Sequence, residues 1–467
     1  MKAAPTLLAA AALLAACAGP EPGRPSAPEA AAAAVPAAFP QAGGAGTAAA
    51  ELPWALAFKG ERLQRLIPLA LANNRDLRVA ALNIEAARAT AGARDADLWP
   101  TVSAGISGSR TPTAAGGINS LYTAGLQVSA YELDLFGRLR GLSAAAAAQL
   151  LAAQANQQAV RTALVAGVAN AEIALQADEA LLKLTRDTVA TREQSLDLTR
   201  QRFDGGVANE LDLRSAESSL QTARAALAQA QRQRTLDENA LALLLGGPLP
   251  ADLPAPSGDL ADFEPLAELP AGLPSDVLTR RPDIRQAEFT LAAADADIDA
   301  ARAAFWPRIT LTGQFGTASS QLSGLFRHTA WSFAPSLVQP IFDAGRNRAN
   351  LAGARAARDI ALALYEKAIQ TAFREVADGL AGRATLAEQR AALAAQADAE
   401  TRRLAAAEQR YAAGVASALD RLDAQRSLFA ARQSLVQLQS QRAQNLVALY
   451  RALGGGADAS AMTPSPR

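Results

Sequence analysis

Cysteine and histidine, on which many catalytic and metal sites depend, are almost absent from this sequence. Its 467 residues contain one cysteine and one histidine. A single cysteine cannot form a disulfide within the chain, and no metal-spaced cluster, phosphate-binding lysine motif or nucleophile elbow occurs. We therefore expect a protein that is not an enzyme and that has no cofactor and no metal site.

Net charge is also lacking. The chain has 45 basic and 45 acidic residues, and no long run of one sign. Nucleic acids and anionic membrane surfaces attract clusters of basic residues, which this balance does not provide. We expect no nucleic-acid partner.

Aromatic residues are scarce, at 5%, although half of the chain is hydrophobic. Alanine is instead the dominant apolar residue. Small side chains at this density favour closely packed long helices over one globular core.

What the sequence does contain is two copies of one plan, displaced by about 207 residues. Trp99-Pro100 returns as Trp306-Pro307, and other landmarks return in the same order. The period is too long for a solenoid, so it indicates the duplication of a whole structural unit. We expect both copies to do one job. The expected segments are a first copy over 55–250, a Pro-rich linker over 251–280, a second copy over 281–455 and a disordered tail over 456–467.

The first residues predict export and lipid attachment. The apolar run from Ala3 to Leu14 is too short to span a bilayer, so we interpret residues 1–16 as a signal peptide. Residues 17–54, rich in Ala, Pro and Gly, are expected to form a tether. The run that ends at Cys17 resembles the bacterial lipobox, which implies lipid such as palmitate on Cys17 and favours the outer membrane. The alternative is a chance cysteine.

Proline-free stretches predict two long helices. Residues 138–204 and 345–413 contain no proline, and a helix of this length extends roughly 100 Å. It is stable only with a partner. The segments that follow step their apolar residues by three and four, as in a coiled-coil seam. Each copy therefore contains a predicted helical hairpin, over 138–245 and over 345–452. The tips of the two hairpins are the turns at Gly205, Gly206 and Val207 and at Gly414, Val415 and Ala416.

Four segments change to a period of two, which is typical of strands with one apolar and one polar face. They lie at about 101–110, 122–131, 309–316 and 331–338. This pattern is typical of transmembrane β-barrels, although a soluble amphipathic sheet is the alternative. Four strands cannot close a barrel, and open edges in lipid leave backbone groups unpaired. Two copies of the chain would give eight strands and three would give twelve, and an aqueous lumen favours the trimer.

Three motifs make a family resemblance clear. They are Arg280-Arg281-Pro282-Asp283-Ile284, Pro340-Ile341-Phe342-Asp343-Ala344-Gly345-Arg346 and Leu422-Asp423-Ala424-Gln425-Arg426. With the lipobox and the duplicated plan, they resemble the TolC-like outer-membrane efflux proteins, and in particular the OprM/NodT-type lipoproteins.

The resemblance implies a mainly α fold with a transmembrane β part. It implies a homotrimer in which a twelve-stranded outer-membrane β-barrel continues into a long periplasmic coiled-coil α-barrel. Such a protein is the passive exit duct of a tripartite pump for drugs or other small toxic compounds. Its partners would be a periplasmic adaptor protein, an inner-membrane RND transporter and the outer-membrane lipid. The two glycine turns resemble the adaptor contacts of the family.

A candidate gate lies just after the second tip. Leu419, Asp423 and Arg426 share one helix face, at i, i+4 and i+7. Their match to constriction residues of the family implies a periplasmic gate, in which a leucine ring blocks passage and the charges hold the helix ends together. The alternatives for Asp423 are the helix dipole and surface pairing with Arg426. Asp212 and Asp420 are explained more simply by helix capping.

Other readings remain open from the sequence. The chain as a whole is also compatible with an exit duct for type I polypeptide secretion, or with a non-conducting periplasmic coiled-coil lipoprotein scaffold. Trp99 and Trp306 either end the helices before the strands or act as interfacial anchors. Arg281 precedes a proline at the start of a predicted helix, and a structural role is enough to explain it.

Overall fold

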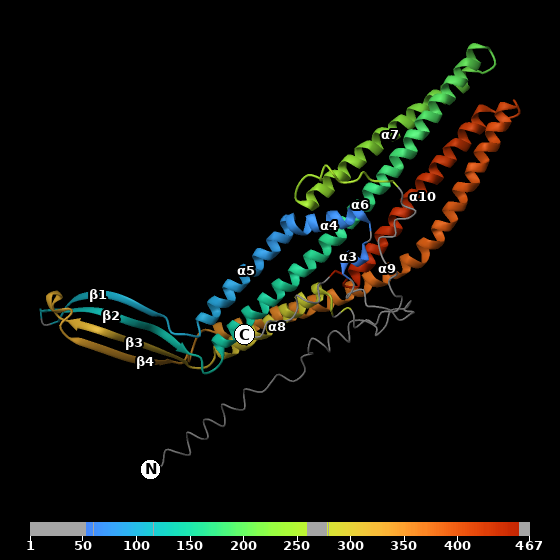
Figure 1. The fold of residues 1–467 in the computed structure, drawn as a ribbon. Helices are drawn as coiled ribbons and strands as arrows, with labels where there is room; N and C mark the ends of the chain where they lie inside the picture. Colours follow the sequence, from blue (N-terminus) through green and yellow to red (C-terminus); the bar gives the residue numbers. More distant parts are fainter. Residues whose placement is uncertain (1–52, 59, 115, 259–277, 279, 457–467) are drawn as a thin grey trace.

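The computed structural model describes residues 53–58, 60–114, 116–258, 278 and 280–456. A four-stranded sheet lies at one end of a long helical body (Figure 1). The predicted signal peptide, Cys17, nearly all of the tether, most of the linker and nearly all of the tail lie outside the described residues. The elements, in order, are α3 (Trp54–Ala57), α4 (Glu61–Asn73), α5 (Arg75–Ala96), β1 (Val102–Pro112), β2 (Ile118–Leu133), α6 (Arg138–Asp204), α7 (Glu210–Leu245), α8 (Pro282–Ala303), β3 (Arg308–Ser319), η3 (Leu322–Gly324), β4 (Thr329–Val338), α9 (Arg346–Ala412) and α10 (Ala418–Ala452).

The duplication is visible in the lengths of the elements. Helices α5 and α8 both have 22 residues, and α6 and α9 both have 67. The returning helices α7 and α10 have 36 and 35. Each copy therefore consists of a short helix, two strands and a long helical hairpin. The expectation of a mainly α fold with an internal repeat and a small β part is confirmed.

The sheet joins the two copies. Its order is β1-β2-β3-β4, with every neighbouring pair antiparallel, so that β2 of the first copy pairs with β3 of the second. The register places side chains of one kind in line across the strands, because residues that face each other point to the same side of a sheet. One such line is apolar and consists of Ala104, Leu126, Phe315 and Trp331. The next line is polar and consists of Ser103, Gln127, Gln314 and Ser332.

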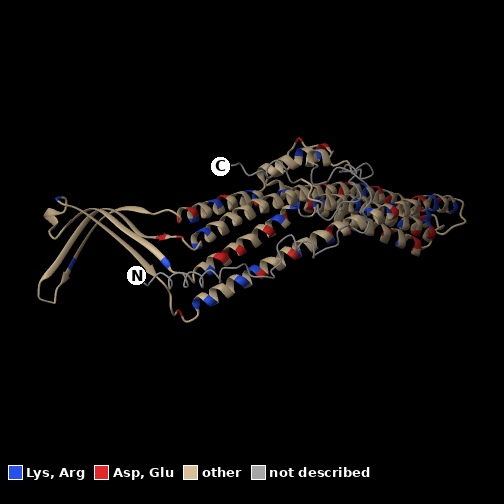
Figure 2. Ribbon diagram, turned by 90° about the horizontal axis from the view of Figure 1, so that it is seen from below, with Lys and Arg blue, Asp and Glu red and all other residues tan. Residues whose placement is uncertain are grey.

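Charged residues are confined to the ends of the strands. Arg110, Glu132 and Arg308 are the charged residues within β1 to β4, and each lies within three residues of a strand end. Figure 2 shows the same contrast, with charges distributed along the helices and almost none along the strands. The middle of the sheet is therefore an uncharged band with an exposed apolar face.

Strand β2 is longer than the sequence pattern indicated. It extends over Ile118–Leu133, and its pairing with β3 shifts between Val128 and Tyr131, where Ala130 has a positive φ of 51°. One extra residue in a strand reverses which side chains face each side. Simple alternation puts Ala130 on the apolar face, whereas the bulge puts Tyr131 there. The period of two in the sequence is interrupted at this point for that reason.

Helix α6 is the centre of the helical body. It packs against α4, α5, α7, α8 and α10, whereas α9 packs against α8 and α10. The main apolar core draws on both copies and includes Ile173 of α6 and Val447 of α10, with Phe58 in edge-to-face contact with Tyr450 at 5.4 Å between ring centres. Nearer the first tip, α6 and α7 share a smaller core. The predicted seam is buried there, at Leu213, Ala216, Leu220 and Ala223.

None of the helices within the described ranges is both long and apolar enough to cross a membrane.

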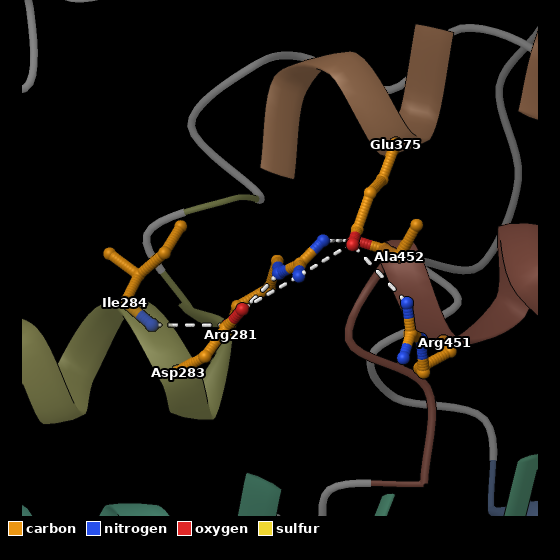
Figure 3. Close-up of polar contacts among 6 residues, drawn as sticks. All are labelled: Arg281, Asp283, Ile284, Glu375, Arg451 and Ala452. Atoms are coloured by element: carbon orange, nitrogen blue, oxygen red, sulfur yellow. Dashed lines mark hydrogen bonds and ion pairs between the residues drawn. The ribbon is translucent and has the colours of Figure 1, made fainter. Parts of the chain in front are cut away.

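Arg281 ties the start of α8 to the second hairpin (Figure 3). Its buried guanidinium donates to the carbonyl oxygen of Ala452 at 2.8 Å and to the carboxylates of Asp283 and Glu375 at 2.7 and 2.9 Å. Arg451 contacts the other oxygen of Glu375 at 3.2 Å. The guanidinium thus closes the C-terminal end of α10, where carbonyl groups lack partners within the helix. These contacts agree with the structural role that the sequence indicated for Arg281.

Candidate functional site at the hairpin tips

The tips of both hairpins lie at the end of the molecule farthest from the sheet (Figure 1). Each long helix ends in the same hydrogen-bond pattern. The Val207 N–H donates to Arg202 at 2.8 Å and the Gly206 N–H to Phe203 at 2.9 Å, and Val415 and Gly414 repeat this with Arg410 and Tyr411 at 3.0 and 3.1 Å. This is the Schellman termination, which needs a residue with positive φ. Gly206 and Gly414 supply it, at 73° and 74°.

The two turns that the sequence predicted as adaptor contacts are accessible to solvent in the single chain. Val207 and Val415 are 70% and 66% exposed. A Cβ atom added to Gly206 or Gly414 would meet no atom within 4 Å. The two turns are therefore open surfaces of nearly equal geometry.

The return helices begin with side-chain caps. Asn209 accepts from the Asp212 N–H at 2.8 Å, and Ser417 accepts from the Asp420 N–H at 3.2 Å. Asp420 also accepts from the Ser417 N–H at 3.0 Å, which completes a capping box. The hydrogen bonds from the Ser417 hydroxyl and backbone lower the pKa of Asp420. Capping accounts for Asp420, as the sequence predicted.

The three predicted gate residues lie on the exposed part of α10. Leu419 is 63% exposed, and Arg426 contacts Asp423 at 3.5 Å. The shorter contact of Asp423 is with Arg403 of α9, at 2.5 Å, and Arg403 also contacts Glu400 at 3.2 Å. The structure therefore brings Asp423 and Arg426 together, but it adds a closer partner from the other helix of the hairpin.

Sequence reasoning missed Arg403. A signal was present, because Arg403 and Asp423 stand ten residues before and ten residues after Ala413 at the tip. In an antiparallel hairpin, residues equally distant from the turn lie opposite each other. Hydrogen bonds to the carboxylates raise the pKa of Arg403, with the larger effect from Asp423 and the smaller from Glu400.

Buried arginines connect the second hairpin to α6, and these too were missed. The ring of Tyr411 makes cation–π contacts with the guanidinium groups of Arg202 and Arg421, at 4.7 and 4.3 Å from the ring centre. Both Tyr411 and Arg421 are buried, so these cation–π contacts join α6, α9 and α10. In the sequence, such arginines look like ordinary residues of a solvated helix face.

Arg192 makes the second connection. This buried residue of α6 donates to the side chain of Gln425 on α10, which lies 3.5 Å from the Ser195 hydroxyl. Burial lowers the pKa of Arg192, and repulsion from Arg426 and Arg421 adds to the effect. Three guanidinium groups therefore converge where α10 crosses α6, and one of them belongs to the predicted gate.

Two stretches of the chain, residues 66–247 and 273–455, match the family model described as "Outer membrane efflux protein". Among curated proteins, the toluene efflux pump outer membrane protein TtgC of Pseudomonas putida is 48% identical over 423 residues, which cover 88% of this chain and 87% of that protein. The outer membrane protein OprJ of Pseudomonas aeruginosa is 45% identical, with 88% of both chains covered.

Solved structures give the same picture. The open state of the Neisseria gonorrhoeae MtrE outer membrane channel is 40% identical, with a TM-score of 0.83, and the match covers 94% of this chain and 98% of that one. A structure of CusC is 38% identical, with a TM-score of 0.83, over 94% of this chain and 100% of that one. The similarity extends over both copies of the repeat.

Proposed function

Since the chain belongs to the outer membrane efflux protein family and is the outer-membrane channel of a tripartite efflux pump, we propose that three copies form one closed duct whose periplasmic end is gated by α10. The duct is passive. In this proposal an inner-membrane RND transporter supplies the energy and the cargo, and a periplasmic adaptor protein connects the transporter to the duct.

The four-stranded sheet is the observation that supports assembly into a trimer. Within the described residues β1 pairs only with β2 and β4 only with β3, so both outer edges are open. The sheet also has an exposed apolar face and an uncharged middle. Unpaired backbone groups cost several kcal/mol each in hydrocarbon, and pairing of β4 with β1 of the next copy removes both edges. Three copies give twelve strands, with the polar line at Gln127 and Gln314 facing the lumen.

The cargo we propose consists of small apolar or amphipathic toxic compounds. Relatives over nearly the whole chain carry names that refer to toluene, solvents and antibiotics. In this proposal the pump selects the compound, and the duct conducts whatever the pump delivers.

The gate we propose consists of Leu419, Asp423 and Arg426, with Arg403 as the residue that holds Asp423 in place. Around a threefold axis, exposed leucines block the opening. The Asp423 carboxylate keeps α9 and α10 together through Arg403, and Arg426 adds a weaker contact. Separation of α9 and α10 at the tip by the adaptor would break the exposed contact of Asp423 with Arg403 at small cost, since solvent-exposed ion pairs contribute little to stability.

The proposal is tested with purified full-length protein. Native mass spectrometry is expected to give a trimer, and planar bilayers are expected to show discrete ion-conducting events. A monomer or dimer would refute the stoichiometry. A complete lack of conductance, also after the gate pairs are removed, would favour a non-conducting scaffold.

Lipid on Cys17 is part of the proposal. It rests on the lipobox-like run before Cys17. A Cys17→Ala variant is expected to lose labelling by a fatty-acid analogue, while part of the channel activity survives because the strands still insert. A Cys17→Ser variant serves as a near-isosteric control and is expected to behave in the same way. Undiminished labelling of either variant would reject the assignment.

A further inference from the structure

Arg192 is a buried guanidinium without a carboxylate as its partner. The residue is only 5% exposed and lies in the part of α6 that α10 crosses. Within the described ranges it donates to the amide oxygen of Gln425 and forms no ion pair. Burial of a charge costs free energy that a neutral amide repays only in part. Arg192 therefore lacks a counter-ion in the described part of the chain.

Two more guanidinium groups add positive charge at this level. Arg421 of α10 is 6% exposed, and its Nε atom is buried without a hydrogen-bond partner. Arg426 contacts Asp423 at 3.5 Å, but this carboxylate lies closer to Arg403. Repulsion from Arg426 and Arg421 acts on Arg192 and contributes to its lowered pKa, after burial. The crossing of α6 and α10 thus carries a local excess of positive charge.

The first copy of the repeat has a different charge balance at the equivalent positions. The residue 208 positions before Gln425 is Glu217, whose carboxylate contacts Arg214 at 2.9 Å. The residue 208 positions before Arg421 is Leu213, which belongs to the smaller core. The second copy therefore has an amide in place of a carboxylate and a guanidinium in place of an apolar side chain. Both differences make this level of α10 more positive than the same level of α7.

A cavity of about 110 Å³ lies beside Arg192. Residues of α6, α9 and α10 of the same chain line it, among them Gln425, Leu404 and the exposed Arg432. One water needs about 10 to 15 Å³ of such a space, so the cavity has room for an inorganic ion with part of its water. Asp187 is the carboxylate among the lining residues, and it is exposed and forms no ion pair with Arg192.

We propose that this cavity binds a small inorganic anion of the size of chloride, held by the guanidinium of Arg192 and supported by the charge of Arg421. A guanidinium has five N–H groups, so those not directed at Gln425 can donate to the anion. The anion would be the missing counter-ion where α6 meets α10, and it would strengthen the contact between the two hairpins. The site does not rest on the proposed gate, because it needs only the packing of helices within one chain.

Thermal unfolding of the purified full-length protein in detergent tests the site. At constant ionic strength and with the same cation, replacement of gluconate by chloride is expected to raise the midpoint temperature until the effect saturates. The reason is that a ligand of the folded state stabilises it, and gluconate is too large for this cavity. Equal midpoint temperatures in the two salts at every concentration would overturn the proposal.

Substitutions of arginine test the donor. The dissociation constant for chloride is expected to rise about tenfold in Arg192→Gln, because a charged hydrogen-bond donor is lost. Arg192→Lys keeps the charge and should retain part of the affinity, whereas Arg421→Leu, which copies the first repeat, should weaken binding severalfold. Arg186→Gln is the matched control, because Arg186 is an exposed arginine of the same helix outside the lining. Unchanged affinity of Arg192→Gln would contradict the site.

Asp187→Asn separates a bound anion from an internal counter-ion. If chloride balances Arg192, loss of this carboxylate from the lining should leave the chloride affinity equal or tighter. A lower midpoint temperature in gluconate, together with a loss of the chloride effect, would show that Asp187 pairs with Arg192 in solution and would overturn the proposal.

Bromide locates the anion directly. It has the charge of chloride and nearly its size, and its anomalous scattering identifies it in a crystal. Crystals of the full-length protein grown with bromide are expected to show an anomalous peak beside the Arg192 guanidinium, and crystals of Arg192→Gln should lack it. No peak at Arg192 in the parent protein would refute the site. These measurements need no channel activity, so failure of the anion site and failure of the proposed duct are distinguishable.

Discussion

The two copies of the repeat make one equivalent contact in two different ways. In this contact, which we call the joint, the residue that precedes the short helix (α5 or α8) donates to the end of the returning helix (α7 or α10). In the first copy the Asn74 amide donates to the carbonyl oxygen of Leu244 at 3.0 Å. In the second copy the residue 207 positions later is Arg281, and it donates to Ala452, which stands 208 positions after Leu244, at 2.8 Å. One backbone requirement, a donor for the end of the returning helix, is thus met by an amide or by a guanidinium.

The guanidinium brings a second requirement, because a buried charge must be paired. Glu375 supplies a carboxylate to Arg281 at 2.9 Å, whereas the equivalent residue of the first copy, 208 positions earlier, is Gly167. The charged donor of the second copy is thus accompanied by a carboxylate that the first copy, with its neutral amide, does not have at the equivalent position.

The long helices differ in the same manner. In the central helix α6, the fully buried Glu172 is held by Arg62 of α4 at 2.6 Å. Its equivalent in α9, 208 positions later, is Leu380, which packs against the apolar core. Equal length therefore does not mean equal surroundings.

The proposed gate is also confined to one copy. Arg403, Asp423 and Arg426 have serines as their equivalents, each 208 positions earlier. These serines are Ser195, Ser215 and Ser218. The tips have nearly the same backbone, but the first hairpin joins its two helices through other pairs, Arg224 with Glu193 at 2.9 Å and Arg200 with Glu217 at 3.9 Å.

The largest effect is expected at the joint. Arg281→Ala removes the buried guanidinium that holds Ala452, Asp283 and Glu375, and breaking a buried ion pair costs about 3 to 5 kcal/mol. Asn74→Ala removes a hydrogen bond and a helix cap and should cost about 1 to 2 kcal/mol. The free energy of unfolding in urea, followed by circular dichroism in detergent, measures both.

A transplant sharpens this prediction. Arg281→Asn together with Glu375→Ala reproduces the neutral joint of the first copy and should lose less stability than Arg281→Ala alone. Equal losses for Arg281→Ala and Asn74→Ala would show that charge makes no difference between the two joints.

The tips should be equivalent in their effect on transport. Gly206→Glu and Gly414→Glu place a bulky charge in open space, at a backbone cost of about 1 to 2 kcal/mol. Together they are expected to abolish efflux while the trimer still assembles, because the substituted positions face solvent. Accumulation of a fluorescent pump substrate in cells and cross-linking to the adaptor measure the loss. Adaptor cross-links of unchanged yield would place the contact elsewhere.

Substitutions at the gate level should change conductance in the second copy of the repeat but not in the first. Asp423→Ala with Arg426→Ala is expected to raise single-channel conductance severalfold and to sensitise cells to vancomycin, because the charged contacts between the helix ends are lost. Ser215→Ala with Ser218→Ala is the matched control from the first copy and should leave conductance unchanged. Conductance equal to the parent in a correctly assembled Asp423/Arg426 variant would contradict the gate.

A pH dependence of stability is expected from the first hairpin and not from the second. Burial, followed by the neighbouring Asp237, raises the pKa of Asp178 from 3.8 to about 7. The equivalent residues of the second copy are Leu386 and Asn445. Since the folded protein binds this proton between pH 3.8 and about 7 and the unfolded chain does not, stability should fall as the pH rises through that window and level off above it.

Asp178→Asn should flatten this slope, which is at most about 1.4 kcal/mol per pH unit for one proton. Thermal unfolding at a series of pH values measures it. Asp187→Asn, at an exposed position of the same helix, is the control and should retain the slope. A parent protein whose stability rises between pH 4 and 7 would show that other groups outweigh Asp178.

Much of the fold could be predicted because its signals are local. Proline-free stretches, glycines at helix ends and a change of period from helical to two are read within a few residues. They placed the start of α6 at Arg138 and the turn at Gly414 where the structure has them. The gate residues Leu419, Asp423 and Arg426 came from one helix face together with a family resemblance, and their role stays a prediction.

The rest depended on residues that are distant in the chain and adjacent in space. The bulge at Ala130, the partner Arg403 of Asp423, the cluster around Tyr411 and the cavity beside Arg192 each require two or more elements to be in place. A sequence records which side chains can pair, but burial and proximity decide which of them do. Local patterns in the sequence are therefore sufficient to specify two copies of one plan of helices and strands. That α6 lies at the centre and α9 at an edge follows from the folded arrangement, because these two helices of equal length pack against different neighbours.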